Sequence, residues 1–167
     1  MKQLYEVEAA KALMTEAQSW SVMKWLREKK RVRKTADEAN AALDDLSQSL
    51  RESWPESLRE AYESLGGPRD KTKAEAGGKA KLSTAIDSQA LLLAKELKKA
   101  DDEAYRARMN AEETFDDAEK KLSTSLAREG CRKAIQCWEL KERAIRKAET
   151  VSHTKQITKQ DETKSRI

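Results

Sequence analysis

The stretch IDSQALLLAKELKKADDEAYRARMNAEETFDDA, residues 86–118, carries the strongest structural signal in the chain. Small or apolar residues recur along it at alternating steps of four and three. These positions are Ile86, Ala90, Leu93, Leu97, Ala100, Ala104, Ala107, Ala111, Thr114 and Ala118. A mean spacing of about 3.5 residues is the repeat of a coiled-coil seam. The segment therefore predicts a long helix that packs along one face against another helix.

A second stripe with the same alternation lies upstream, in residues 3–52, which contain neither proline nor glycine. Its positions are Val32, Ala36, Ala39, Leu43, Leu46 and Leu50. Two such segments joined by one region rich in helix breakers predict an all-α fold, a long antiparallel helical hairpin of coiled-coil type. A reversal near residue 66 would place residue n beside residue 132 − n.

The region between the two stripes predicts the turn of the hairpin. Ser53 and Glu56 have the spacing of a capping box, and Pro55 suits a first helical turn. A short helix over 54–65 is expected, with Gly66 as its C-terminal cap. The segments after it are predicted as a glycine-rich loop over 66–80 and a second arm over 82–130.

The C-terminal part of the chain predicts one more helix and a tail. Ala134, Trp138, Ile145 and Ala148 share about one face of a helix over 131–151. The sequence leaves open whether this helix extends the second arm or folds back. We expect residues 1–152 to form a single domain and the polar, basic residues 153–167 to form a tail.

The composition limits both the core and the class of protein. Charged residues make up 38% of the 167 residues, aromatic residues 5%, and the net charge is +4. Such a chain favours amphipathic helices over a thick core, and its mixed charge argues only weakly for a polyanion partner. No apolar stretch is long enough to span a bilayer, and MKQLYEVEAAKALM has no uninterrupted apolar segment typical of a secretory signal. A location in the cytoplasm or inside an organelle is the default expectation, and the cytoplasm is the one we predict.

Charge is distributed in opposite blocks on the two arms. Residues 24–34 carry seven cations and one acid, whereas residues 101–119 carry eight acids and two cations. Flanking charges of this kind select the register of coiled coils. We expect the basic block to be mainly an internal register device, with some of Lys30, Arg31 and Lys34 left free for an external anion.

Tryptophans and their neighbours form the candidate partner-binding residues. The chain has four tryptophans, and Trp20 and Trp25 bracket an apolar cluster that is wider than a two-helix seam requires. Three interpretations remain open: a thicker packing layer, an exposed anchor for a partner, or insertion into a membrane interface. The candidate residues are Trp20, Met23, Trp25, Leu26 and Trp138.

The last part of the chain is also basic and supplies further candidate anion contacts. They are Arg132, Lys133, Arg143, Arg146 and Lys147. Nucleic acid or an acidic lipid surface would be the ligand, although base-stacking aromatic residues are missing there apart from Trp138. The alternative interpretation is a solubilising tail.

No pattern supports catalysis or a cofactor. The acidic pairs Glu112/Asp116 and Glu113/Asp117 lack the histidines of di-metal bundles, and the one histidine is His153. Cys131 and Cys137 do not share a helix face, so we expect small core residues and neither a zinc site nor a disulfide framework. AGGKAKLST, residues 76–84, lacks the phosphate-loop pattern. We therefore expect no metal and no cofactor.

Together these features predict a non-enzymatic interaction protein: a scaffold, adaptor or accessory subunit of a larger assembly. Its partner would be another protein or a second copy of the chain. The alternative is a binding module for nucleic acid or an acidic membrane, acting through residues 24–34 and 131–166.

Overall fold

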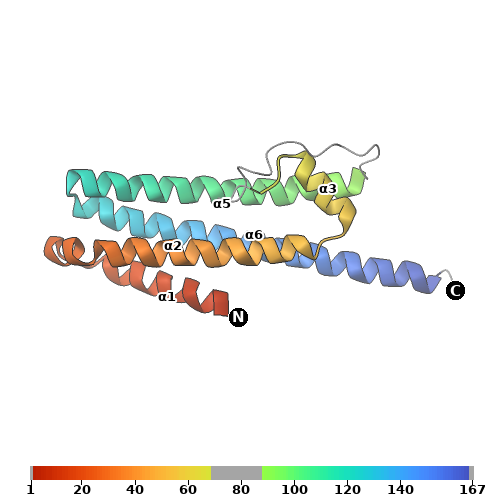
Figure 1. The fold of residues 1–167 in the computed structure, drawn as a ribbon, viewed down its shortest axis with the longest axis horizontal. Coiled ribbons are helices and arrows are strands. Elements are labelled where there is room, and N and C mark those ends of the chain that lie inside the picture. The colour runs from red at the N-terminus through yellow and green to blue at the C-terminus, as the bar shows by residue number, and fades with distance from the viewer. Residues whose placement is uncertain (1, 69–87, 166–167) are drawn as a thin grey trace. The chain divides into compact units, whose positions relative to one another are not determined.

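The computed structural model describes the backbone of residues 2–68 and 88–165 and the side chains of residues 5–68 and 88–150. These residues form helices and no strand, which confirms the all-α prediction for the described part of the chain (Figure 1). The helices are α1 (Lys2–Ala17), α2 (Val22–Glu52), α3 (Glu56–Ser64), α5 (Ser88–Lys121) and α6 (Thr124–Ser165). They group into two compact units, which are described in turn.

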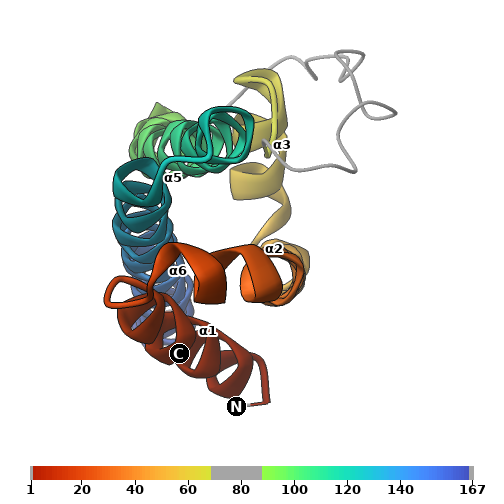
Figure 2. The same cartoon turned by 90° about the vertical axis from the view of Figure 1, so that its left-hand side faces the viewer.

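Unit 1 comprises Met1–Leu46 and Glu103–Glu142. In it α1, most of α2, the end of α5 and the start of α6 lie side by side (Figures 1 and 2). Contacts join α6 to each of the other three helices: to α1 through Lys11 and Glu142, to α2 through Asn40 and Trp138, and to α5 through Thr114 and Lys133. Unit 1 is therefore a four-helix packing and not a two-helix seam.

The α2 and α5 helices run antiparallel in unit 1, as the two stripes predicted, but their register is different. Arg33 forms ion pairs with Asp116 (3.0 Å) and Glu119 (3.4 Å), whereas a reversal at residue 66 would have placed it beside residue 99. Asp44 and Arg108 form an ion pair at 3.0 Å in the same register. The predicted register is therefore wrong by more than four helical turns. The observed pairs place residue n of α2 beside about residue 149 − n to 152 − n of α5.

The buried face of α5 in unit 1 is broader than the predicted stripe. Ala104, Ala111 and Ala118 are buried as expected. Between them Phe115 is also buried, beside Thr114, and the Arg108 side chain is only 13% exposed. The cause is that α5 packs against both α2 and α6, so its buried face has to serve two neighbours.

Two helix breaks in unit 1 differ from the predicted boundaries. The expected arm over 3–52 is divided between α1 and α2, because Ser21 Oγ accepts the Lys24 N–H (3.2 Å) and caps a new helix. The second arm ends at Lys121 and not at residue 130. Ser123 Oγ accepts the Leu126 N–H (3.2 Å) at the start of α6, which folds back on α5.

Gly130, a candidate break in the sequence, lies inside α6. A Cβ atom built there would approach the Phe115 ring to 2.8 Å, so this glycine permits close packing of α6 on α5. The helix face predicted for the C-terminal segment is correct, because all four of its members are buried. They are Ala134, Trp138, Ile145 and Ala148.

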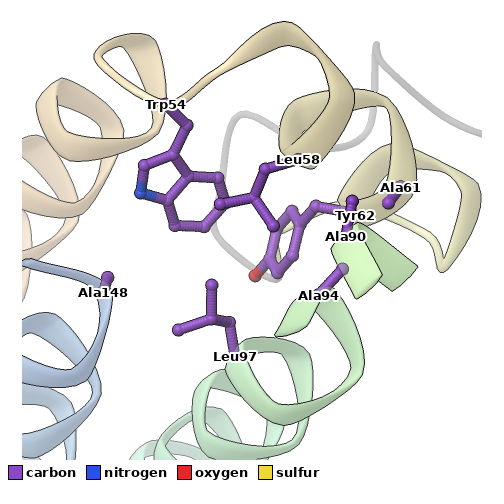
Figure 3. Close-up of a cluster of buried hydrophobic side chains, with 8 residues drawn as sticks. All are labelled: Trp54, Leu58, Ala61, Tyr62, Ala90, Ala94, Leu97 and Ala148. Carbon is purple, nitrogen blue, oxygen red and sulfur yellow. The ribbon is translucent and has the colours of Figure 1, made fainter. Parts of the chain in front are cut away.

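Unit 2 comprises Ser47–Asp102 and Arg143–Ile167, and its core gathers around one tryptophan (Figure 3). The Trp54 and Tyr62 rings meet edge to face at 5.3 Å, and Leu58 and Leu97 are buried with them. Ala94 is buried here in place of the predicted Leu93, which is only partly buried. The short helix α3 thus uses one face to cover the start of α5.

The ends of α3 confirm one predicted cap and contradict the other. Gly66 has φ 108° and donates its N–H to the Glu63 carbonyl, as a C-terminal glycine does. The capping box is absent, because Ser53 Oγ donates to the Leu50 carbonyl (2.7 Å) and no side chain caps the helix at Pro55.

The remaining boundaries concern the loop and the tail. Most of the predicted loop over 66–80, the AGGKAKLST segment and the start of the second arm lie outside the described residues. The predicted tail over 153–167 is helical as far as Ser165. Among the helices of the described residues, none has the length and apolar character that a bilayer crossing requires.

Candidate functional site

The candidate tryptophans are part of the packing of unit 1. Trp20, Trp25 and Trp138 are all buried, and the Trp25 ring stacks on Phe115 with centroids 6.2 Å apart. Trp138 Nε1 donates a hydrogen bond to Asn40 Oδ1 at 2.9 Å. Their burial contradicts the interpretations of these tryptophans as exposed anchors or as membrane-inserting residues. The observed arrangement is the first interpretation, a thicker packing layer, with the C-terminal helix folded back.

The aliphatic candidates beside these tryptophans are exposed instead. Met23 is 68% exposed, and Leu26 and Val22 are also classed with the exposed large apolar residues. All three lie in the first turns of α2. They form a surface cluster on a helix whose opposite face, with Trp25 and Val32, is already buried.

The basic block of α2 is used in part for internal pairing. Arg33 binds Asp116 and Glu119 of α5, which bears out the expected match of basic and acidic blocks. Arg31 forms a local ion pair with Glu28 at 3.5 Å. No ion pair joins Lys30 or Lys34 to another described residue, and both are exposed.

Lys30 and Lys34 line an open groove of about 650 Å³ along α2. Its lining combines both signs of charge. The residues are Lys29, Lys30, Arg33, Lys34, Asp37, Glu38, Ala41 and Glu119. Asp37 and Glu38, like the lysines, form no ion pair with a described residue. We call this surface the α2 groove.

The basic candidates on α6 differ in whether they contact other residues of the protein. Lys133 is occupied, since its Nζ lies 3.0 Å from Thr114 Oγ1, 3.2 Å from Asn110 Oδ1 and 3.7 Å from a Glu129 carboxylate oxygen. This internal bonding contradicts its assignment as an external anion contact.

The other α6 candidates remain at the surface. Arg132, in unit 1, is exposed, and so are Arg143, Arg146 and Lys147, in unit 2. Arg132, Arg143 and Lys147 form no ion pair with any described residue. They therefore stay candidates for contact with an anion.

Buried polar contacts hold the helices of unit 1 in place. Arg108 Nη1 lies 3.0 Å from Asp44 Oδ2, and Lys11 Nζ lies 2.5 Å from Glu142 Oε1. Burial lowers the pKa of Lys11, but the hydrogen bond and charge of Glu142 raise it more, so the net shift is upward. These pairs fix α1 and α5 on their neighbours.

The acidic and thiol candidates are likewise structural. Glu112 and Asp116 each bind an arginine, and in the described part of the chain no cluster of metal-ligating side chains occurs. Cys131 and Cys137 are buried free thiols, and burial raises the pKa of both to about 12. A protonated thiol is a weak nucleophile, so neither cysteine has an activated sulfur.

A small cavity of about 30 Å³ lies in unit 2 beside Trp54, Tyr62 and Asp101. Tyr62 donates a hydrogen bond to Asp101 Oδ2 at 3.0 Å, and burial together with Asp101 raises the pKa of the phenol. The space suits a water molecule and not an organic substrate.

Sequence reasoning missed three exposed residues at the α5–α6 turn: Lys120, Lys121 and Leu122. The sequence signal for this turn was the end of the four-three alternation after Ala118. It was overlooked because Leu122 and Leu126 follow at steps of four, which is also helical spacing.

Comparison with known proteins assigns neither a family nor a function to the chain. No family model matches the chain, and neither a curated protein nor a solved structure shows significant similarity to it. A function has to be inferred from the surfaces described above.

Proposed function

We propose that this chain is a non-enzymatic helical interaction protein, a scaffold, adaptor or accessory subunit of a larger protein assembly. The observation that carries the proposal is the α2 groove. It is open, and it combines lysines (Lys29, Lys30 and Lys34) and acids (Asp37 and Glu38) of one helix, none of which forms an ion pair with a described residue.

The mixed charge of the groove favours a protein partner over a polyanion. A nucleic acid would gain from the lysines but would be repelled by Asp37 and Glu38, which follow Lys34 after about one helical turn and Lys30 after about two. A polypeptide can present an acidic and a basic residue in the matching order. Charges arranged in this way select a partner and its orientation more than they add affinity.

The rigidity of the surface supports the same function. Helix α2 is held from two sides in unit 1, by Arg33 with Asp116 on α5 and by Asn40 with Trp138 on α6. A partner therefore meets a preformed surface and loses little additional conformational entropy there.

Native purification followed by size-exclusion chromatography with light scattering tests the proposal. We expect a retained protein partner or a stable oligomer of the chain. Charge reversal in K30E/K34E should release the partner, whereas K95E/K99E, which reverses two exposed lysines of α5, should not. A compact monomer that retains no protein would contradict the proposal.

A second candidate function is binding of an anionic surface. It is supported by exposed cations without a described ion pair: Lys30, Lys34, Arg132, Arg143 and Lys147. The variant D37K/E38K separates the two functions, because it should abolish retention of a protein partner and strengthen binding of a polyanion. Retention on nucleic acid or vesicles at low salt, lost at high salt, would support the second candidate.

A further inference from the structure

Both helical turns of unit 1 lie at the same end of that unit. The α1–α2 turn around Trp20 and the α5–α6 turn around Leu122 occupy the end that faces the viewer in Figure 2. Arg128, in the first turns of α6, lies 3.4 Å from the Trp20 carbonyl oxygen and joins the two. We call this surface, residues 20–31 together with 120–128, the turn end.

The turn end gathers most of the large aliphatic side chains that are exposed among the described residues. Seven large apolar side chains are exposed in the described part of the chain, and four of them belong to this end. They are Val22, Met23, Leu26 and Leu122. Met23 is 68% exposed and Leu122 is 64% exposed, so these two protrude most.

Cations surround this apolar cluster. The turn end contains eight lysines and arginines and a single acid, Glu28. Three of the cations have partners: Lys24 with Glu16, Arg31 with Glu28 and Arg128 with the Trp20 carbonyl. The others form no ion pair with a described residue. They are Arg27, Lys29, Lys30, Lys120 and Lys121.

Leu122 has a backbone conformation that is unusual for its side chain. Its φ is 50°, in the left-handed region where glycine or asparagine is less strained. A turn that only ended α5 would be more stable with either of those residues. Strain combined with an exposed aliphatic side chain points to a role for that side chain outside the fold.

We propose that the turn end docks onto an anionic lipid bilayer, with Met23 and Leu122 entering the boundary between headgroups and acyl chains. The surrounding lysines would contact lipid phosphates and carboxylates. The inference rests on the second candidate function and names its ligand and its site. The protein would lie on the membrane without crossing it.

The chemistry of the turn end selects a bilayer over other anionic partners. A nucleic acid offers charge but gains little from aliphatic side chains, since bases stack on aromatic rings, and Trp20 and Trp25 are buried here. A bilayer rich in acidic lipids offers apolar depth and negative charge in one surface, which matches an aliphatic centre with a basic rim.

Vesicle flotation of the full chain tests the proposal, with phosphatidylcholine vesicles against vesicles containing about one-third phosphatidylserine. We expect binding to the acidic vesicles only. K120Q/K121Q should weaken it by about thirtyfold, from roughly 1 kcal/mol for each charge at the surface. The matched control is K95Q/K99Q, which removes two exposed lysines elsewhere on α5 and should bind like the parent.

Leu122→Asn separates the lipid contact from folding. It should raise the melting temperature by relieving the strained backbone. It should weaken vesicle binding by about tenfold, because the bilayer would lose an aliphatic side chain that enters it only partway. Leu92→Ser, at a residue that is also 64% exposed, should leave binding unchanged.

Each remaining outcome overturns the proposal. If L92S and L122N weakened vesicle binding equally, or if K120Q/K121Q bound vesicles like the parent, the turn end would not be the membrane-binding site. The second candidate function, binding of an anionic surface, would still stand. If the protein were retained on RNA but did not float with vesicles, its anionic ligand would be a nucleic acid and not a bilayer. A dimer that is disrupted by L122N without any flotation would assign the turn end to a second copy of the chain.

Discussion

Trp138 and Asn40, which are 98 residues apart in the sequence, are joined by a hydrogen bond of 2.9 Å in the interior of unit 1. Both side chains are buried, so the indole N–H has no access to bulk water. The contact fixes the rotation of α6 against α2.

Replacing Asn40 by leucine should lower the free energy of unfolding by about 1–3 kcal/mol, because the indole donor would be buried without an acceptor. Urea unfolding followed by circular dichroism measures the loss. In N40L/W138F both polar groups are absent. The decrease in unfolding free energy of this double variant should therefore be smaller than the sum of the decreases in N40L and W138F. Strict additivity would show that the hydrogen bond contributes nothing.

The ion pair between Asp44 and Arg108 predicts a second sensitive site. Asp44→Ala should destabilise the protein by about 2 kcal/mol, since Arg108 is only 13% exposed and would lose its partner on α2. Asp45→Ala, at the exposed neighbouring position, is the matched control and should change stability by less than about 0.5 kcal/mol. Chemical denaturation of the two variants in parallel makes the comparison.

Gly130 should respond to alanine in the opposite sense to an ordinary helical glycine. Gly→Ala inside an exposed helix stabilises by about 1 kcal/mol. Here the new Cβ would meet the Phe115 ring at 2.8 Å, so G130A should destabilise by about 1–3 kcal/mol. G130A should cost less in a Phe115→Leu background, where the ring edge is absent. A rise in melting temperature for G130A alone would show that the α5–α6 contact is looser than described.

In unit 2, Tyr62→Phe should lower stability by about 1.5–3 kcal/mol, because the phenol donates to the buried carboxylate of Asp101. Tyr5→Phe, at a residue that is 76% exposed, should have no measurable effect. Thermal unfolding monitored by circular dichroism distinguishes the two. Equal effects of both variants would rule out the Tyr62–Asp101 contact as the cause.

Cys131 and Cys137 predict a loss of stability at alkaline pH. Burial raises their pKa from an ordinary value of 9.0 to about 12 in the folded protein. The thiol pKa is higher in the folded than in the unfolded protein. The contribution of the buried, protonated thiols to the free energy of unfolding is therefore complete below pH 9 and is lost as the pH rises toward 12.

The melting temperature should therefore fall more steeply above pH 9 in the parent than in C131A/C137A. Both thiols should also resist iodoacetamide at neutral pH until urea unfolds the protein. Rapid labelling of the folded protein would contradict their burial.

Much of the helical architecture could be predicted from residue spacing. Ala90, Leu97, Ala104, Ala111 and Ala118 recur every seven residues, and all five are buried. Spacing could not locate the breaks at residues 18–21 and 122–123, because neither contains glycine or proline. The serine caps that start α2 and α6 use side chains that are equally common elsewhere in the chain.

The candidate surfaces were only partly predictable. The lysines of α2 were found because they form a dense run, and Met23 because it lies beside tryptophans. Composition could not show that Trp20 and Trp25 are buried, since a tryptophan cluster has the same sequence whether it fills a core or anchors a partner. Leu122 was missed because its exposure follows from a left-handed turn that no local pattern marks.

The sequence by itself determined that the described chain is helical and that α2 and α5 meet antiparallel with opposite charges along their edges. Helical periodicity is a local property, because each side chain's direction follows from the backbone of its own turn. Only the tertiary structure decided the register of Arg33 against Asp116, the fold-back of α6 and the partial burial of Arg108. Those depend on how several helices share one interior, where the contacts of all the faces are satisfied together and no single stripe sets the alignment.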